Sequence, residues 1–172
     1  MKFWTKLGVL AAGLMLLSAT TAQAQTATSS FTVNATVAAN CTISTVGISF
    51  GAYDPVVANA TTDLDSNGSV TVACTAGAAT TIGMDQGGTP TATSTAAAPE
   101  RQMDSGTDQL RYDLYQDASR TVVWGDVGTP AALAYNSTTF AAQVFTIYGQ
   151  VPAGQDVNTG TYTDTVTATI SF

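Results

Sequence analysis

The feature that most constrains this chain is the segment of residues 31–37, in which apolar and polar side chains alternate. Successive side chains of an extended strand point to opposite faces, so Phe31, Val33, Ala35 and Val37 would share one apolar face. The segment lies between an N-terminal leader and the first cysteine. A strand with one apolar face must bury that face, and we expect it to do so in a neighbouring molecule. This hypothesis makes the chain a polymerising subunit.

Residues 1–24 are typical of a signal peptide. Lys2 and Lys6 precede or border an apolar run over residues 7–17, and small residues, Ala22 and Ala24, occupy the expected cleavage-site positions. The run is about half of the roughly 20 apolar residues that a membrane-spanning helix needs. We therefore predict an exported mature chain that begins at Gln25 and inserts no segment into a membrane.

Charge and residue types argue against several classes of function. The chain has no histidine, and both of its lysines lie in the leader, so the mature chain has no imidazole for a catalytic triad or a metal and no lysine for a Schiff base. Three arginines and twelve acidic residues leave the mature chain with a net charge of −9, which disfavours binding to nucleic acid and to anionic membrane surfaces. We expect no enzymatic activity, no cofactor and no metal.

The rest of the chain has the alternation and turn signals of an all-β protein. Strands are predicted at residues 42–50, 69–74, 79–85, 110–115, 121–124, 143–148 and 161–172, and a surface loop at residues 87–100. Cys41 and Cys74, an even number of cysteines in an exported chain, are expected to form a disulfide. The number of strands suggests an immunoglobulin-like sandwich of two sheets.

The last predicted strand runs to the final residue of the sequence. Val166, Ala168, Ile170 and Phe172 would lie on one face of this strand, with threonines and a serine on the other. No further element follows to cover the edge of the strand. Such an edge exposes unpaired backbone groups, a hazard that proteins must manage.

Four other patterns were weighed as sites. The sequence from Asp63 to Gly68 fits the first half of a calcium loop, but Cys74 replaces the glutamate that should end it, so an Asn-Gly hairpin turn is the favoured interpretation. The acidic residues Asp104, Asp108, Asp113 and Asp117 are too dispersed for a recognisable glycosidase pair.

A sugar-stacking platform could be formed by four aromatic residues, Trp124, Tyr112, Tyr115 and Tyr148, although core packing is favoured. Five Asn-x-Ser/Thr sequons, at Asn34, Asn40, Asn59, Asn67 and Asn136, are interpreted as products of a Thr- and Asn-rich composition.

Several short motifs together carry a family likeness. They are Phe31-x-Val-x3-Val37 before Cys41-Thr-Ile43, Phe50-Gly-Ala-Tyr53, Val72-x-Cys74, Arg101-x-Met103, Leu110-x-Tyr-x-Leu-Tyr115, residues 121–125, Tyr148-Gly149 and Gly160-x-Tyr-x-Asp164. With these motifs the chain resembles the spore coat protein U domain family, which includes subunits of archaic chaperone-usher pili. The likeness covers essentially the whole mature chain.

The resemblance implies an incomplete immunoglobulin-like β-sandwich, over residues 40–172, that lacks its last strand. Donor-strand complementation would complete the sandwich: a periplasmic chaperone fills the groove first, and residues 25–39 of the next pilin subunit then replace it, with Phe31, Val33, Ala35 and Val37 as the donor side chains. The acceptor would lie beside Val166, Ala168, Ile170 and Phe172. The further partner implied is an outer-membrane usher, and the product is an extracellular fibre serving adhesion or biofilm formation.

Two other hypotheses stay open at the level of sequence. The first is a non-polymerising secreted coat or matrix protein of the same fold, whose own N-terminal strand completes the sandwich. The second is a carbohydrate-binding adhesin.

Overall fold

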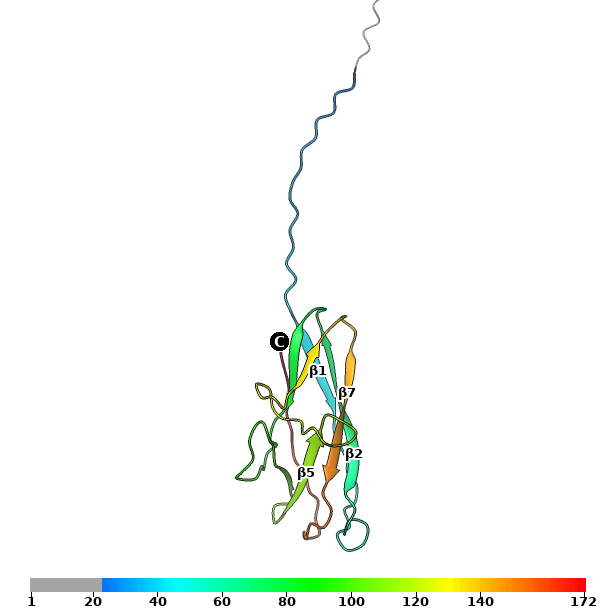
Figure 1. Ribbon diagram of the computed structural model, residues 1–172, viewed down its shortest axis with the longest axis vertical. Coiled ribbons are helices and arrows are strands. Elements are labelled where there is room, and N and C mark those ends of the chain that lie inside the picture. The colour runs from blue at the N-terminus through cyan, green and yellow to red at the C-terminus, as the bar shows by residue number, and fades with distance from the viewer. Residues whose placement is uncertain (1–22) are drawn as a thin grey trace, which may run out of the picture. The chain divides into compact units, whose positions relative to one another are not determined.

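The computed structural model describes residues 23–172, and these residues form strands and loops without a helix. Eight strands make two sheets (Figure 1). The five-stranded sheet has the order β1-β2-β7-β5-β4, and the three-stranded sheet has the order β6-β3-β8. The strands are β1 (Cys41–Val46), β2 (Leu64–Cys74), β3 (Ala79–Met84), β4 (Arg101–Asp104), β5 (Gln109–Tyr115), β6 (Leu133–Asn136), β7 (Gln143–Val151) and β8 (Ala168–Ser171). All their pairings are antiparallel. The all-β prediction is confirmed.

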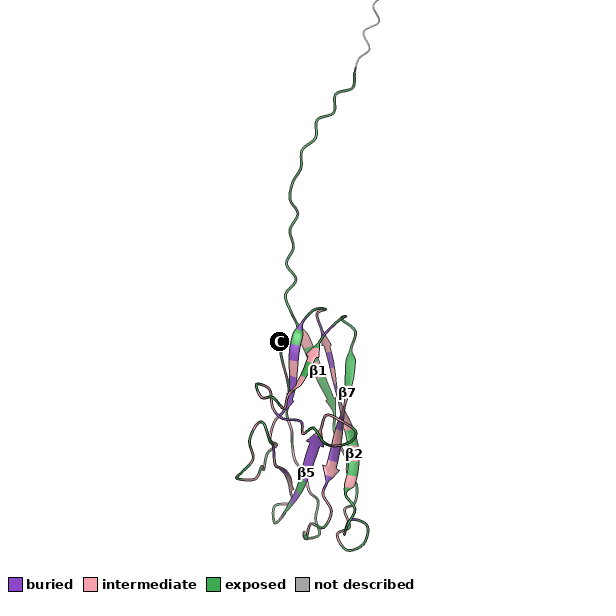
Figure 2. Cartoon of the chain, viewed as in Figure 1, coloured by how far each residue is buried: buried purple, intermediate pink, exposed green. Residues whose placement is uncertain are grey.

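The core lies between the inner faces of the two sheets. It consists of alternate residues of β2, β3, β5 and β7, as the period of two in their sequences predicts. The fully buried side chains include Val70, Val72, Ile82, Met84 and Val151. Figure 2 shows β5 as a largely buried strand, and its predicted inward residues Leu110, Tyr112 and Leu114 are each buried. The predicted core faces of β2, β3 and β5 are therefore confirmed.

The predicted Asn-Gly turn at residues 67–68 is wrong. Asn67 pairs with Tyr148 and Gly68 pairs with Ile147, so both lie inside β2. Gly68 is needed for space, because a Cβ atom there would lie 2.6 Å from the carbonyl oxygen of Val46 and 2.8 Å from Cγ1 of Ile48. Because Gly68 has no side chain, residues 46–48 can cross close over β2.

Other boundaries also differ from the sequence prediction. β1 ends at Val46 instead of residue 50, β7 continues to Val151, and the short strands β4 and β6 were not predicted. The predicted strand at residues 121–124 is reduced to one bridge, between Tyr115 and Val123. The predicted strand at residues 161–172 is divided into a bridge at Thr163, to Asp104, and β8. The loop at residues 87–100 contains no strand, as predicted.

Gly149 explains why the chain leaves the sheet after β1. A Cβ atom at Gly149 would lie 2.9 Å from Cδ1 of Ile48 and 2.9 Å from Cζ of Phe50. The missing side chain leaves the space that these two residues fill on the inner face of β7. Phe50 also packs against Tyr112, with ring centroids 6.2 Å apart. Residues 47–50 therefore turn inward and contribute to the core instead of extending β1.

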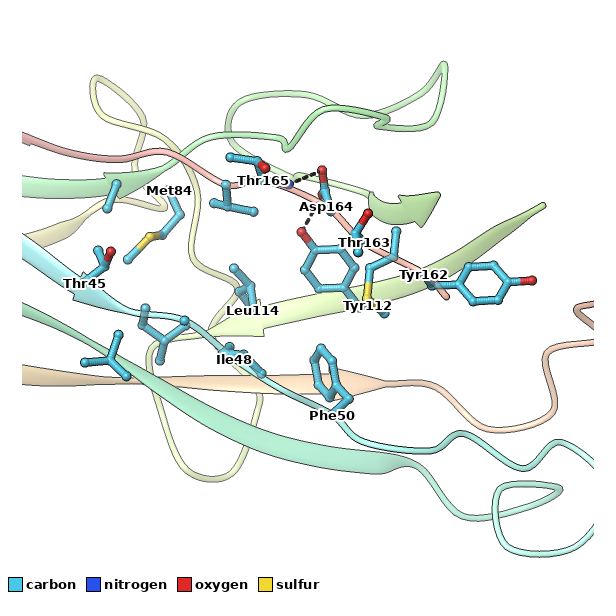
Figure 3. A pocket seen from close by; sticks show the side chains of 16 residues that line it. Thr45, Ile48, Phe50, Met84, Tyr112, Leu114, Tyr162, Thr163, Asp164 and Thr165 are labelled. Carbon is cyan, nitrogen blue, oxygen red and sulfur yellow. Dashed lines mark hydrogen bonds between the residues drawn. The ribbon is translucent and has the colours of Figure 1, made fainter. Parts of the chain in front are cut away.

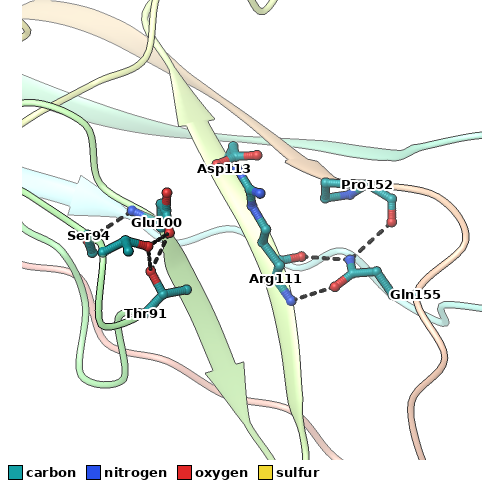
Figure 4. A network of polar contacts seen from close by, with 8 residues as sticks. Thr91, Ser94, Glu100, Arg111, Asp113, Pro152 and Gln155 are labelled. Atoms are coloured by element: carbon teal, nitrogen blue, oxygen red, sulfur yellow. Dashed lines mark hydrogen bonds and ion pairs between the residues drawn. The ribbon is translucent and has the colours of Figure 1, made fainter.

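Beyond the end of β7, the side chain of Gln155 is hydrogen-bonded to the backbone of β5 (Figure 4). The side-chain oxygen of Gln155 accepts a hydrogen bond from the Arg111 amide at 2.8 Å, and its Nε2 donates to the carbonyls of Arg111 and Pro152. The Gln155 amide in turn donates to the Tyr53 hydroxyl, which donates to the carbonyl of Pro152. These bonds fix the loop of residues 152–158 against β5.

Candidate functional site

An open groove runs along one edge of the sandwich, between residues 45–56 and residues 156–168. Two cavities, of about 380 and 880 Å³, share Ile48, Phe50, Met103 and Tyr162 and so form one continuous groove. Its floor comes from β5, β7 and the inward segment of residues 47–50 (Figure 3), and includes Leu114 and Ile147. Most of these side chains are apolar. The groove is therefore a place where an apolar strand face can be buried.

One wall of the groove is the C-terminal segment of residues 162–170. On the side that faces away from the groove, the backbone of this segment is hydrogen-bonded to other parts of the chain. Thr163 exchanges two backbone hydrogen bonds with Asp104, and the amide of Asp85 donates to the carbonyl of Thr167. Because bonded residues alternate along an antiparallel strand, the backbone groups of Val166 and Ala168 point to the other side, toward the groove. Within residues 23–172, no backbone hydrogen bond on the groove side of Val166 or Ala168 pairs this strand edge.

Asp164 holds this wall in place. One carboxylate oxygen accepts hydrogen bonds from the amides of Gly88 and Thr165, each at 2.7 Å, and the other accepts one from the Tyr112 hydroxyl at 2.6 Å (Figure 3). A Cβ atom at Gly87, whose φ is +78°, would collide with this carboxylate. Burial raises the pKa of Tyr112 far above its ordinary value, and the hydrogen bond to Asp164 adds to the shift. The tyrosine is therefore a permanent donor at neutral pH.

Of the predicted residues of the C-terminal strand, Val166 and Ala168 line the groove. Val166, Ala168 and Ile170 are partly buried and pack against the core, while the intervening residues are exposed, so the predicted faces are confirmed for these three. Phe172 differs, since 56% of its surface is exposed. It lies beyond the end of β8, where no strand in the described part of the chain covers it.

Residues 31–37 belong to no strand of this chain. The N-terminal unit ends at Ala35, and the domain extends from Thr36 to Phe172. Phe31, Val33 and Val37 are each at least 80% exposed, and Ala35 is exposed as well (Figure 2). Among the described residues, three large apolar side chains on one alternating face are therefore exposed.

The connector of residues 38–40 continues the line of β1. The amide of Thr75 donates to the carbonyl of Asn40 at 2.9 Å, and the amide of Asn40 donates to the Thr75 hydroxyl at 3.1 Å. The same hydroxyl lies 3.4 Å from the carbonyl of Ala38. A sharp reversal of the chain within residues 38–40 would break these hydrogen bonds.

The disulfide prediction is confirmed, since Cys41 and Cys74 are bonded to each other. The two cysteines are also directly paired residues of β1 and β2, and Cys74 is buried. The bond attaches the start of β1, an edge strand, to the neighbouring strand. It therefore fixes the end of the domain where the connector begins.

The alternative sites lose their support. Trp124 is fully buried and donates its indole hydrogen to the carbonyl of Ile82 at 2.9 Å, and Tyr112 is buried too, so no exposed platform contains them. Among residues 23–172, no three acidic or cysteine side chains converge as metal ligands. Asp63 instead accepts a hydrogen bond from the amide of Ala153, and Asp65 forms an ion pair with Arg120.

The side chain of Asn59 is buried, so this sequon is not on the surface. In the part of the chain that the structure describes, no helix could cross a bilayer.

The structural role of Arg101 was not predicted from the sequence, although the residue belongs to the family motif Arg101-x-Met103. It is fully buried, and its guanidinium donates to the carbonyls of Met84, Asp85 and Trp124 at 2.8–3.0 Å. Burial lowers its pKa. This one side chain joins β4 to the end of β3 behind the groove. A buried, carbonyl-binding arginine has no periodic signal in a sequence.

The chain matches a protein-family model over most of its length. The model of the Spore Coat Protein U domain matches residues 27–169. Among curated proteins, the chain is similar to Protein U of Myxococcus xanthus, with 40% identity over 177 residues that cover 98% of this chain and 97% of the relative.

A solved structure shares the fold. It is the crystal structure of the CsuC-CsuE chaperone-tip adhesion subunit pre-assembly complex from archaic chaperone-usher Csu pili of Acinetobacter baumannii. The match has a TM-score of 0.55 and 22% identity, and it covers 80% of this chain. The chain spans only 40% of the length of the matched chain.

Proposed function

Because the chain belongs to the Spore Coat Protein U domain family, we propose that it is a structural subunit of a surface fibre of the archaic chaperone-usher type. In this proposal, residues 25–39 of one subunit enter the groove of the next subunit as the missing strand. Phe31, Val33, Ala35 and Val37 face the groove floor. The fibre supports adhesion or biofilm formation.

The single observation that carries the proposal is a complementarity between two parts of one chain. The groove has an apolar floor and a free strand edge along Val166 and Ala168, whereas residues 31–37 form an unpaired segment with one apolar face. Strand addition to a sheet edge uses both features, since backbone hydrogen bonds supply affinity and alternate side chains set the register. In this proposal the tail of one copy supplies a strand to the groove of the next copy.

The energies indicate where the stability of such a joint comes from. Burial of Phe31, Val33 and Val37 contributes roughly 1.5–3 kcal/mol each, while ordering about ten tail residues costs about 1–2 kcal/mol each. The tail side chains alone cannot offset this cost. The rest must come from backbone hydrogen bonds, at about 0.5–1.5 kcal/mol each, and from the groove floor, which leaves water at the same time.

The partners follow from the same groove. A groove of this kind cannot stay empty in a stable subunit, so a periplasmic chaperone occupies it until an outer-membrane usher exchanges the chaperone for the next tail. The similar solved structure is a complex of a chaperone with a pilus subunit, which supports this assignment. Assembly through the periplasm would place the mature chain outside the cell.

The direct test removes the tail and leaves the groove. We expect a chain without residues 25–39 to bind the chaperone as the complete chain does, and to form no fibres. Normal fibres from the shortened chain would contradict the proposal. Loss of chaperone binding would instead show that the tail is needed for an earlier step.

One observation favours a second candidate. The relative with 40% identity over nearly the whole length is named Protein U, and the family is named after a spore coat protein. A coat or matrix protein of this fold would fill its groove with its own tail and remain a monomer. Size-exclusion chromatography of the mature chain after slow refolding separates the two, because monomer alone at high concentration supports the coat function.

A further inference from the structure

The two ends of the domain carry different loops. The pairs Cys41–Cys74 and Val72–Gln143 place residues 75–78 and 137–142 at the end where the connector enters the domain. We call this the connector end. The pair Leu64–Val151 places residues 51–63 and 152–161 at the opposite end. We call this opposite end of the domain the groove end, because its residues line the larger cavity of the groove.

At the connector end, Phe140 is 85% exposed on an anchored loop. Ser137, which is buried, exchanges backbone hydrogen bonds with Gly77 and Ala78, and its hydroxyl donates to the carbonyl of Thr139 at 2.6 Å. The loop is therefore fixed to the start of β3. A large aromatic side chain is held outward by a rigid support and covers nothing in its own domain.

At the groove end, Val56 and Val57 are 81% and 76% exposed on a second anchored loop. One carboxylate oxygen of Asp54 accepts hydrogen bonds from the amides of both valines at 3.0 and 3.1 Å. Asn59 closes the loop, because its side chain accepts from the amide of Asp54 and donates to the carbonyl of Thr62. The two valines thus form a small, preorganised apolar tip.

The charges of the two ends are compatible with contact. Residues 36–41, 75–78 and 137–142 of the connector end contain no charged side chain, although the mature chain carries a net charge of −9. The groove end is acidic, with Asp54, Asp63 and Asp156 in its loops. Cores of protein interfaces are depleted in charge, and a neutral end can approach an acidic end without repulsion. Two groove ends would repel each other.

The connector is too short to keep two joined domains apart. Only residues 38–40 separate Val37 from Cys41, so four Cα steps span at most about 14 Å. If Val37 lies in the groove of a neighbour, the domain that follows must begin immediately at the mouth of that groove. At the connector end β1 and β8 are in contact, and the cavities begin only at Thr45, so the groove is open toward the groove end. The following domain therefore meets the neighbour with its connector end against the groove end.

We propose that Phe140 of one subunit packs against Val56 and Val57 of the next subunit, as a second contact between copies of this chain beside the inserted strand. This inference rests on the proposed function, since the inserted strand sets the end-to-end arrangement. The contact is head-to-tail and does not close on itself, so it continues along an open fibre. It stiffens the joint, which otherwise depends on the three-residue connector.

Cysteine cross-linking tests the contact in fibres of the full chain. The variant Phe140→Cys with Val57→Cys should give a ladder of covalent multimers after mild oxidation with copper phenanthroline. The control variant, Phe140→Cys with Val122→Cys, should not, because Val122 is an exposed valine that is bonded to Gln116, just past the end of β5 and level with the middle of β7, away from both ends of the domain. Fibres of the first variant without cross-links would overturn this inference and leave the proposed function standing. An unsubstituted chain that forms no polymer would overturn both.

A second variant keeps the test valid if the cysteine variants assemble poorly. We expect Phe140→Ser to assemble into fibres whose persistence length in electron micrographs falls at least twofold, whereas Val122→Ser leaves it unchanged. An unaltered persistence length in Phe140→Ser fibres would contradict the proposed contact, even where donor-strand joining is intact.

Discussion

Tyr112 on the floor of the groove donates a hydrogen bond of 2.6 Å to Asp164 on its wall. The two residues are 52 positions apart in the chain and belong to β5 and to the C-terminal segment. Asp164 also binds the amide of Gly88, so the carboxylate joins three parts of the chain. The wall of the groove is therefore held to its floor and to the loop of Gly88 by one carboxylate.

Replacing Tyr112 with phenylalanine should destabilise the domain by about 1–3 kcal/mol, the range for a hydrogen bond to a charged group. The reason is that Asp164 loses the Tyr112 hydroxyl as a donor while the amide donors of Gly88 and Thr165 remain. Urea unfolding of the full chain measures the effect. The matched control is Tyr162→Phe, whose hydroxyl donates to the exposed carbonyl of Asn158 and should cost less. Equal midpoints for Tyr112→Phe and the unsubstituted chain would show that this hydrogen bond does not hold the wall.

Phe31→Asp should block assembly, because a carboxylate on the inward face of the tail would be buried in an apolar groove without a partner. The neighbouring change Thr32→Asp places the same charge on the opposite face and should leave assembly largely intact. Electron microscopy of exported protein, with size-exclusion chromatography, measures both. Equal loss in the two variants would mean that the charge of the tail matters and its alternation does not.

Removal of the disulfide by Cys41→Ala with Cys74→Ala should lower the free energy of unfolding by about 3–4 kcal/mol, the chain-entropy value for its 33-residue loop. The loss should appear first at the connector end, where β1 is an edge strand. Hydrogen exchange of the amides of β1 checks this. Unchanged protection of β1 in the variant would show that pairing with β2 alone holds the strand.

Asp113→Asn should raise stability at pH 7. Burial raises the pKa of the Asp113 carboxyl above its ordinary value, against the opposing effect of Arg111. A raised pKa in the folded state means that the stability contribution of this group is complete below the unfolded pKa and is lost as the pH rises through the folded pKa. The advantage of the asparagine variant should therefore disappear as the pH falls through that window. Denaturation midpoints from pH 7 to pH 3 measure it, and a constant difference would contradict the assignment.

Asp117→Asn is the control of opposite sign. Hydrogen bonds from the Ser119 hydroxyl, from the Val122 amide and from Thr121 hold the pKa of the Asp117 carboxyl well below its ordinary value. Stability from this group is present above its unfolded pKa and is lost as the pH falls through the folded pKa. The variant should consequently be less stable than the unsubstituted chain at pH 7. A gain in stability would show that the turn at residues 117–122 does not use the charge.

The strands that could be predicted are those with one buried face. Alternation identified the inward residues of β2, β3 and β5, because Val, Leu, Ile and Met lie on only one face of each of these strands. Trp124 also followed from its type, since a large aromatic residue is more often core than surface. The disulfide was predicted from an even count of cysteines together with the expectation of export.

What could not be predicted depends on contacts between distant segments. Asn67-Gly68 has the composition of a turn, but the glycine serves the close crossing of residues 46–48 over β2. Likewise, the floor made by Ile48 and Phe50 exists because Gly149, about a hundred residues later, has no side chain. Neither relationship is local, so no window of sequence contains it.

The C-terminal segment shows both what alternation can predict and what depends on contacts with distant parts of the chain. Its inward face was read correctly at Val166, Ala168 and Ile170, because that face packs on the core. Its length as a single strand was wrong, because the segment pairs first with Asp104 of β4 and then with β3 of the other sheet. The groove itself could not be predicted from alternation, because its lining residues come from segments far apart in the sequence.

The most direct test of the central claim is refolding of the domain with its missing strand supplied as a peptide. A chain that begins at Asn40 is denatured and refolded with a synthetic peptide of residues 25–39, and the product is measured by native mass spectrometry and thermal unfolding. The account predicts a one-to-one complex that unfolds at a clearly higher temperature than the chain alone. It also predicts no complex with the same peptide carrying Phe31→Asp. A domain that is equally stable without the peptide, or that binds both peptides alike, would contradict the claim that this groove is an acceptor for residues 31–37.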